Sequence, residues 1–297
     1  MPISIHRSAT AEDPPGGPDE RSNATVRRLL RTRSGVVGCA IIAAFVLVAL
    51  MAPVLGLWSP DTQDLLHTLA RPSWSHPLGS DQLGRDLLSR VLYGARTSMG
   101  LALVVVGVAL VIGTFLGLAA GLEGEWVDAV IMRAVDMLMA FPSILLALAI
   151  VSALGSGLLN TMIAIGISAI PRFTRIMRAS VLALKTQEFI EAARAAGASD
   201  LYIARAHLLP NALAPVIVFA ALLMADAVSI AAGLGFLGMG VQPPTAEWGA
   251  MLSEGRVYMR VAAHVVAFPG LAIMLMVLGF NLLGTGLRDA LDVRLAD

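Results

Sequence analysis

Charged residues, cysteine and lysine are all scarce in this sequence of 297 residues. Charged side chains make up 14% of the chain and hydrophobic ones 57%, whereas soluble domains carry roughly a quarter of charged residues. A water-soluble fold could not bury so much apolar surface, so this composition excludes an ordinary soluble domain. The formal net charge is zero, which gives no electrostatic reason to expect a nucleic-acid partner.

The single cysteine and the single lysine exclude several kinds of chemistry. Cys39 lies in an apolar run, so we expect no intrachain disulfide and no multi-cysteine metal site. Lys185 has no glycine shortly before it, whereas a phosphate-binding loop needs Gly-x-x-x-x-Gly-Lys followed by Ser or Thr. The five histidines form no His-x-x-x-His pair, so a zinc protease site is unsupported. We therefore predict no catalytic residues, no metal, no cofactor and no ATPase site on this chain.

Long apolar runs are what the sequence has in abundance. A helix needs ~20 apolar residues to cross a hydrocarbon core of ~30 Å, because lipid cannot satisfy bare backbone groups. We predict an all-α polytopic membrane protein with six transmembrane helices. They cover residues 36–58, 99–121, 135–155, 157–171, 212–238 and 264–286. Gly113 and Gly117 in the second run predict close packing against another helix.

The polar segments suggest how the chain is divided and oriented. Residues 1–25 are rich in Pro, Gly, Asp and Glu, which predicts a disordered cytoplasmic tail rather than a cleaved signal. We then expect an N-terminal region with the first span and an outer segment (26–94), a membrane-spanning core (95–290) with a cytoplasmic loop (186–210), and a short cytoplasmic tail (291–297). The expected cytoplasmic segments hold 15 of the 21 Arg and Lys residues, so both termini should be cytoplasmic.

The cytoplasmic loop contains two expected short helices. Glu188 to Ala196 is a good helix former, and Gly197 is placed to cap its C-terminus. Ser199 can then cap a second helix that starts near Asp200, and Pro210 should end that helix.

The second of these helices has a narrow apolar stripe. Leu201, Ala204 and Leu208 recur in it at helical spacing. A short amphipathic helix of this kind could dock in a groove on another protein or could lie on the membrane surface.

The same loop resembles that of the permease family of ATP-binding-cassette importers. In that family it has the form Glu-Ala-Ala, three residues, Gly, and a Leu-Pro pair further on, which is matched here by Glu191, Ala192, Ala193, Gly197, Leu209 and Pro210. The resemblance implies a type I importer permease fold, in which the loop forms a coupling helix that enters a cleft of the ATPase subunit. The coupling residues would be Glu191, Ala192, Ala193, Gly197, Ser199, Asp200, Leu201, Ala204, Leu208, Leu209 and Pro210.

Further segments resemble the dipeptide and oligopeptide subgroup of these permeases. They are His76-Pro77-Leu78-Gly79-Ser80-Asp81, Phe236-Leu237-Gly238-Met239-Gly240 and Asn281-Leu282-Leu283-Gly284. The resemblance implies a pore-forming subunit in a prokaryotic cytoplasmic (inner) membrane, embedded in membrane lipid. Its partners would be a second permease subunit in a heterodimer, one or two kinds of ATP-binding subunit, and an extracytoplasmic substrate-binding protein.

The cargo implied by this resemblance is a short peptide. Similar permeases import nickel chelates, glutathione or opines, which remain alternatives. An ion-coupled secondary carrier is an alternative of a different class, but we find no convincing inverted repeat of the kind such carriers often contain.

Two aspartates lie deep in apolar runs, where an ionisable group is costly and suggests a transport pathway or a partner on another helix. We expect Asp136 to pair with Arg133, one helical turn away. Asp226 is a possible pore residue that could receive the amino terminus of a peptide. The alternative is a structural hydrogen bond across a subunit interface.

Overall fold

A computed structural model of the protein describes residues 27–55 and 58–291. Helices dominate this part of the chain, and its β structure is limited to an isolated bridge between Ser80 and Asp86. The predicted all-α class is therefore confirmed, while the predicted tail at 1–25 lies outside the described residues. The elements are α2 (Arg33–Met51), η1 (Leu65–His67), α3 (Leu87–Glu123), α4 (Glu125–Met139), α5 (Ser143–Leu154), α6 (Leu158–Lys185), α7 (Glu188–Ala195), α8 (Asp200–Ile203), η2 (Ala204–Leu208), α9 (Leu209–Phe236), α10 (Trp248–Gly255), η3 (Arg256–Tyr258) and α11 (His264–Leu291).

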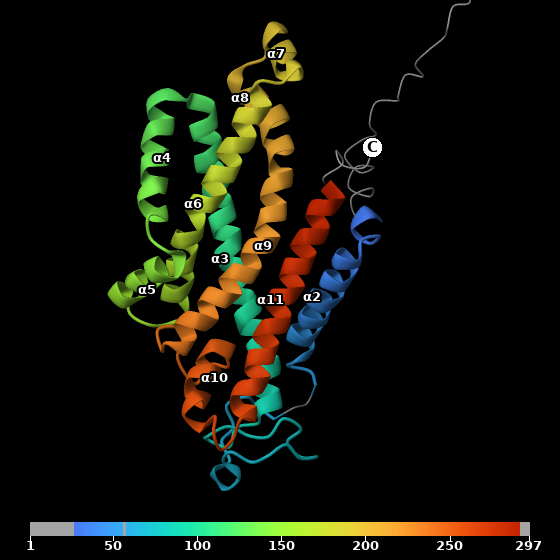
Figure 1. The fold of residues 1–297 in the computed structure, drawn as a ribbon, viewed down its shortest axis with the longest axis vertical. Coiled ribbons are helices and arrows are strands. Elements are labelled where there is room, and N and C mark those ends of the chain that lie inside the picture. Colours follow the sequence, from blue (N-terminus) through green and yellow to red (C-terminus); the bar gives the residue numbers. More distant parts are fainter. Residues whose placement is uncertain (1–26, 56–57, 292–297) are drawn as a thin grey trace, which may run out of the picture.

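The helices form an elongated bundle with two different ends (Figure 1). The short helices α7 and α8 lie at one end, which we call the α7 end. Helix α10 and the segment 58–86 lie at the opposite end, which we call the α10 end. Helices α3, α6, α9 and α11 run along the bundle, and α2 packs against α11 at its edge. Large apolar side chains such as Val104, Phe115 and Leu275 are exposed on the outside, as a lipid-facing surface requires.

Helices α3 and α6 pack against each other along much of their length. A Cβ atom added at Gly113 or Gly117 of α3 would overlap with Phe173 or Met177 of α6. Phe173 and Met177 are themselves fully buried. The prediction that Gly113 and Gly117 allow close packing is therefore confirmed.

The predicted count of six spans is not confirmed. Within the described part of the chain, four helical segments are long and apolar enough to cross a membrane: Arg33–Met51, Leu87–Glu123, Asp200–Phe236 and His264–Leu291. Helices α4 and α5 would add a fifth span only as a pair, and they are bent by 88° relative to each other. The continuous span predicted at 135–155 is therefore wrong. It breaks before Ser143 because Pro142 cannot donate a backbone hydrogen bond and restricts the residue before it.

The predicted short span at 157–171 is part of a longer helix. Helix α6 continues through Pro171 to Lys185. The residues between the predicted span and the loop expected at 186–210 are therefore helical as well. Phe173, Met177 and Val181 follow Pro171 and are completely buried. Burial of these side chains outweighs the loss of one backbone hydrogen bond at the proline.

Pro210 does not end the second loop helix as predicted. The helix runs without a break from Asp200 to Phe236, through a π-helical turn at Ala204–Leu208 in which Leu209 N donates to Ala204 O. The wider turn makes room for the proline ring, which would otherwise clash with the preceding turn. The side chain of Asn211 donates to His207 O at 2.6 Å, which satisfies a carbonyl in this irregular turn.

Candidate functional site

The α7–α8 loop is built around Gly197. Helix α7 ends in a Schellman motif, in which Gly197 N donates to Arg194 O and Ala198 N donates to Ala193 O, at 2.9 and 3.0 Å. Gly197 has a φ of +85°, a region that glycine adopts at low cost. A Cβ at Gly197 would meet nothing within 4 Å, so the glycine is required by the backbone and not by packing within this chain.

The next helix starts as the sequence predicts. The hydroxyl of Ser199 accepts a hydrogen bond from Tyr202 N at 3.4 Å and caps α8. Arg194 of α7 lies 3.8 Å from Asp200 of α8 in an exposed ion pair. Ile190 and Ile203 are fully buried and anchor the two helices to the rest of the chain. The loop is therefore held in one defined shape.

The structure divides the predicted apolar stripe between the surface and the interior. Leu201 is 80% exposed, whereas Ala204 and Leu208 are buried within the chain. The stripe is therefore not available as a whole for docking, because Ala204 and Leu208 pack into the bundle. Of the other predicted coupling residues, Ala193 and Leu209 are half-buried, and the exposed ones are Glu191, Ala192, Gly197, Ser199, Asp200 and Pro210.

Two aromatic residues extend the exposed surface around Leu201. Tyr202 is 57% exposed and Phe189 is 43% exposed, and their rings lie 5.7 and 6.3 Å from the ring of His207. The sequence analysis did not identify Phe189 as a site residue, although it lies next to the Glu-Ala-Ala motif. We call Phe189, Leu201 and Tyr202 the loop apolar patch.

A row of ion pairs connects α6 to its neighbours. Arg172, Arg175 and Arg178 are spaced by three residues along α6, so each is rotated by about 60° from the last. They pair at 2.5 Å with three aspartates on two helices; the pairs are Arg172–Asp226, Arg175–Asp136 and Arg178–Asp128. The prediction that Asp136 pairs with Arg133 is therefore wrong, since its ion-pair partner is Arg175 on another helix.

Arg172 joins three elements near the middle of α6. Its Nη1 atom lies 2.5 Å from Asp226 Oδ2 of α9, and its Nη2 atom donates to Ser143 Oγ at the start of α5, at 2.6 Å. Asp226 thus has an ion-pair partner within the same chain. A cavity of about 290 Å³ opens beside this group and is lined in part by Phe141, Ser143 and Arg172.

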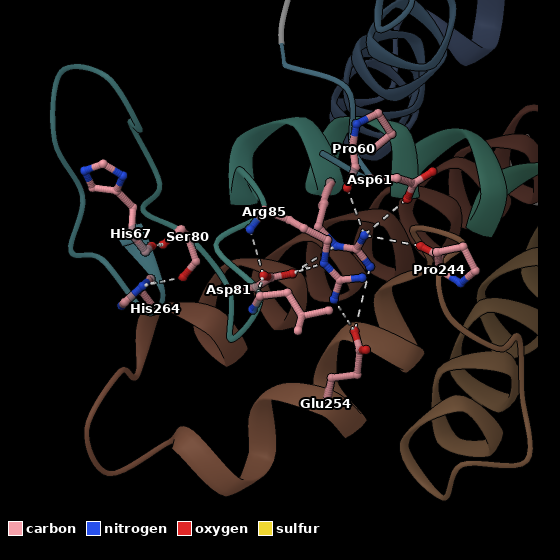
Figure 2. Close-up of polar contacts among 11 residues, drawn as sticks. Pro60, Asp61, His67, Ser80, Asp81, Arg85, Pro244, Glu254 and His264 are labelled. Atoms are coloured by element: carbon pink, nitrogen blue, oxygen red, sulfur yellow. Dashed lines mark hydrogen bonds and ion pairs between the residues drawn. The ribbon is translucent and has the colours of Figure 1, made fainter. Parts of the chain in front are cut away.

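A second polar network lies at the α10 end (Figure 2). Arg85 donates to Asp81 at 2.5 Å and to Glu254 of α10 at 3.0 Å. Arg90 donates to the carbonyls of Pro60 and Pro244, at 3.0 and 3.3 Å. Both arginines are 1% exposed, so each needs these partners to compensate for the loss of hydration. These hydrogen bonds connect the segment 58–86 and α10 to the start of α3.

Comparison with known proteins identifies the family. Residues 113–297 match the model of the binding-protein-dependent transport system inner membrane component, and residues 23–72 match the N-terminal transmembrane domain of oligopeptide transport permease C. The chain belongs to this inner membrane component family. The first match includes the α7–α8 loop and all three α6 arginines.

Characterised relatives of this permease extend over most of its length. It is 47% identical over 269 residues to the dipeptide transport system permease protein of Alkalihalophilus pseudofirmus, covering 91% of this chain and 88% of the relative. It is 45% identical over 270 residues to the glutathione transport system permease protein of Pectobacterium atrosepticum, covering 91% and 90%. The inward-facing MetNI methionine ABC transporter superposes with a TM-score of 0.55 at 22% identity, covering 69% of this chain and 97% of that one, which supports the fold.

The permease also contains features that sequence reasoning missed. The segment from Arg85 to Tyr93 has an apolar face, but the structure makes Leu87 onward part of α3 and buries Arg85 and Arg90. The sequence did contain a signal for this ion pair, because Asp81 and Arg85 are four residues apart. Within residues 27–55 and 58–291, no group of three His, Cys, Asp or Glu side chains is arranged to hold a metal ion.

Proposed function

We propose that this permease forms half of the membrane pathway of an ATP-driven importer of short peptides, and that ATPase subunits act on it through residues 186–210. The relatives named for dipeptide transport and glutathione transport support the peptide assignment. The loop apolar patch supports the coupling assignment, because Leu201, Tyr202 and Phe189 are exposed on a rigid loop at the end of a long helix. A helix presented in this way fits a hydrophobic groove on a partner.

The proposed assembly follows the family. A second permease subunit would complete the pathway as a heterodimer, one or two kinds of ATP-binding subunit would bind the α7 end, and an extracytoplasmic binding protein would deliver cargo to the α10 end. The α7 end and both termini would then be cytoplasmic. ATP binding would draw the two coupling loops together and shift the pathway between inward-open and outward-open states.

Asp226 is proposed as a pore residue. It lies within α9 and is 54% exposed, and a charged side chain inside a membrane segment is tolerated where it has a partner or faces water. Its ion pair with Arg172 meets the first condition, and its own exposure is consistent with the second.

The coupling proposal is tested by ATP-dependent uptake of labelled dipeptides into vesicles that contain the full complex. Gly197→Asp introduces a side chain where the ATPase would bind, at a positive φ. Gly238→Asp is the matched control, since Gly238 closes α9 in the same Schellman motif, with a φ of +78° and equally open surroundings, but lies outside the loop. We expect Gly197→Asp to abolish uptake and Gly238→Asp to preserve most of it. Uptake without ATP would contradict the motor-coupled mechanism.

Glutathione is the second candidate cargo, because relatives at 45–46% identity are named for it. Competition separates the two candidates. An excess of unlabelled glutathione should leave dipeptide uptake largely unchanged if dipeptides are the main cargo, and should suppress it if glutathione is.

A further inference from the structure

We propose that Arg172 and Asp226 together bind the two charged ends of a peptide during transport, with Arg172 taking the carboxylate and Asp226 the ammonium group. The inference rests on the proposed function, because it concerns how the same pathway selects its cargo. It assigns a specificity site to the permease chain itself.

The position of the pair favours contact with a polar cargo. Arg172 lies midway along α6 and Asp226 lies within α9, yet their side chains are 29% and 54% exposed. Exposed charges at this depth are costly in lipid and are expected to face the bundle interior or a water-filled space. The cavity of about 290 Å³ next to Arg172 is close to the lower limit of about 300 Å³ for small-molecule sites. Asp226 does not line this cavity, but it shares a small adjoining cavity of about 10 Å³ with Arg172 and Ser143.

The carboxylate side of the proposed site has a second source of positive potential. Helix α5 begins at Ser143, and Pro142 before it makes no side-chain cap, so the first N–H groups of α5 have no capping side chain. Pro142 and Ser143 line the same cavity as Arg172, and Ser143 accepts a hydrogen bond from Arg172. The N-terminus of a broken membrane helix attracts anionic groups through these free N–H groups and the helix dipole.

An exchange of ion pairs explains why the site would prefer free peptide ends. In the structure Arg172 and Asp226 neutralise each other. A zwitterionic peptide can replace both halves of that pair at once, so no charge is left alone. A peptide with one blocked end can replace only one half, and the other side chain then remains a partly desolvated, unpaired charge, which is strongly unfavourable.

Arg178 and Asp128 provide a matched control within the same row. Their side chains form two hydrogen bonds, at 2.5 and 2.6 Å. Arg178 lies on α6, as Arg172 does, and is six residues further along the chain. Neither residue lines the cavity beside Arg172 or the small cavity that Arg172 shares with Asp226. Loss of this pair tests for a structural role without touching the proposed site.

The test is a binding measurement on the membrane complex of permeases and ATPases in nanodiscs, without the binding protein. Saturation-transfer NMR would use three probes: Ala-Ala, N-acetyl-Ala-Ala and Ala-Ala amide. We expect the wild type to bind Ala-Ala at least ten-fold more tightly than either blocked peptide. Asp226→Asn should remove the discrimination against the acetylated peptide, and Arg172→Gln should remove the discrimination against the amide, while Arg178→Gln and Asp128→Asn change neither ratio.

Three results would overturn the inference: no binding of Ala-Ala to the wild type, equal binding of all three probes, or the same change in all four variants. ATP-driven uptake measured in parallel distinguishes this failure from failure of the proposed function. If the wild type still imports dipeptides, only the inference is wrong. If it imports none, the proposed function is wrong as well.

Discussion

At Glu247, burial and hydrogen bonding act on the same carboxyl group in opposite directions. The residue is 2% exposed, caps α10 through Ala250 N at 2.8 Å and accepts from Ser98 Oγ at 3.2 Å. Burial raises the pKa of Glu247 above its ordinary value, and the donors on Gly249, Ala250 and Ser98 partly oppose that shift. The folded permease therefore binds a proton at Glu247 more readily than the unfolded chain does.

This pKa shift predicts a pH-dependent stability of the α10 end. Because the pKa of Glu247 is raised in the folded state, its contribution to stability is fully present below the ordinary value of 4.5. That contribution is lost as the pH rises through the folded-state pKa. We expect Glu247→Gln to flatten that decrease, since the amide keeps the cap acceptor without a charge. The apparent melting temperature from tryptophan fluorescence, recorded as a function of pH, measures it. Glu123→Gln, at an exposed position, is the control, and an unchanged slope in Glu247→Gln would contradict the prediction.

Arg85 holds a buried ion pair at the same end. Replacing it by alanine removes the 2.5 Å partner of the buried Asp81 carboxylate and leaves it with Arg90 at 3.5 Å, and breaking a buried pair costs up to about 3–5 kcal/mol. We expect Arg85→Ala to lower the melting temperature sharply and Arg85→Lys to lower it less, since the charge remains. Asp64→Asn, in the exposed pair with His67, should leave it unchanged. A melting temperature for Arg85→Ala equal to that of Asp64→Asn would contradict this.

Helix α4 illustrates how an element can be held by charges instead of by packing. Its only buried residue is Val135, and Asp128 and Asp136 tie it to α6. Gly124 with its positive φ precedes it, and the 88° bend follows it. A break in the helical backbone therefore separates α4 from its neighbour in the chain at each end.

The ion pairs of α4 predict its local stability. We expect the double variant Asp128→Asn/Asp136→Asn to speed hydrogen exchange in residues 125–139 by up to about five-fold, since partly exposed pairs contribute no more than about 1 kcal/mol. Exchange in α3 should not change. Glu125→Gln on the same helix is the control. An effect of equal size in α3 and α4 would indicate global destabilisation and would contradict the prediction.

The elements that sequence reasoning predicted correctly are those governed by local chemistry. Gly197 and Ser199 act within one turn of the chain, and both caps are confirmed. Three prolines show the limit of this reasoning. Pro142 breaks a helix, whereas Pro171 and Pro210 do not, because buried side chains in one case and a π turn in the other compensate for the missing hydrogen bond. The partners of Asp136, Asp226 and Arg90 could not be predicted either, since they depend on which helices become neighbours.

At the scale of the whole molecule, one helix connects the two candidate sites. Residues from Asp200 to Phe236 form 37 continuous helical residues, which corresponds to about 55 Å at 1.5 Å per residue. Leu201 lies at one end of it, and Asp226 lies 25 residues further along the same helix. A displacement of the loop by a bound ATPase would therefore reach the mid-span ion pair through a single stiff element.

That arrangement predicts that flexibility near the loop uncouples ATP hydrolysis from transport. Ala206 and Asn211 are exposed, and each change to glycine weakens a helix by up to about 1 kcal/mol. In Ala206→Gly/Asn211→Gly we expect the ATPase to co-purify as before, while the number of ATP molecules hydrolysed per imported peptide rises several-fold. Asn281→Gly/Thr285→Gly, exposed on α11, is the matched control and should keep the wild-type ratio. A wild-type ratio in Ala206→Gly/Asn211→Gly would show that movement of the loop reaches the pathway by another route. Loss of the ATPase from this variant would show that these two positions serve binding rather than transmission.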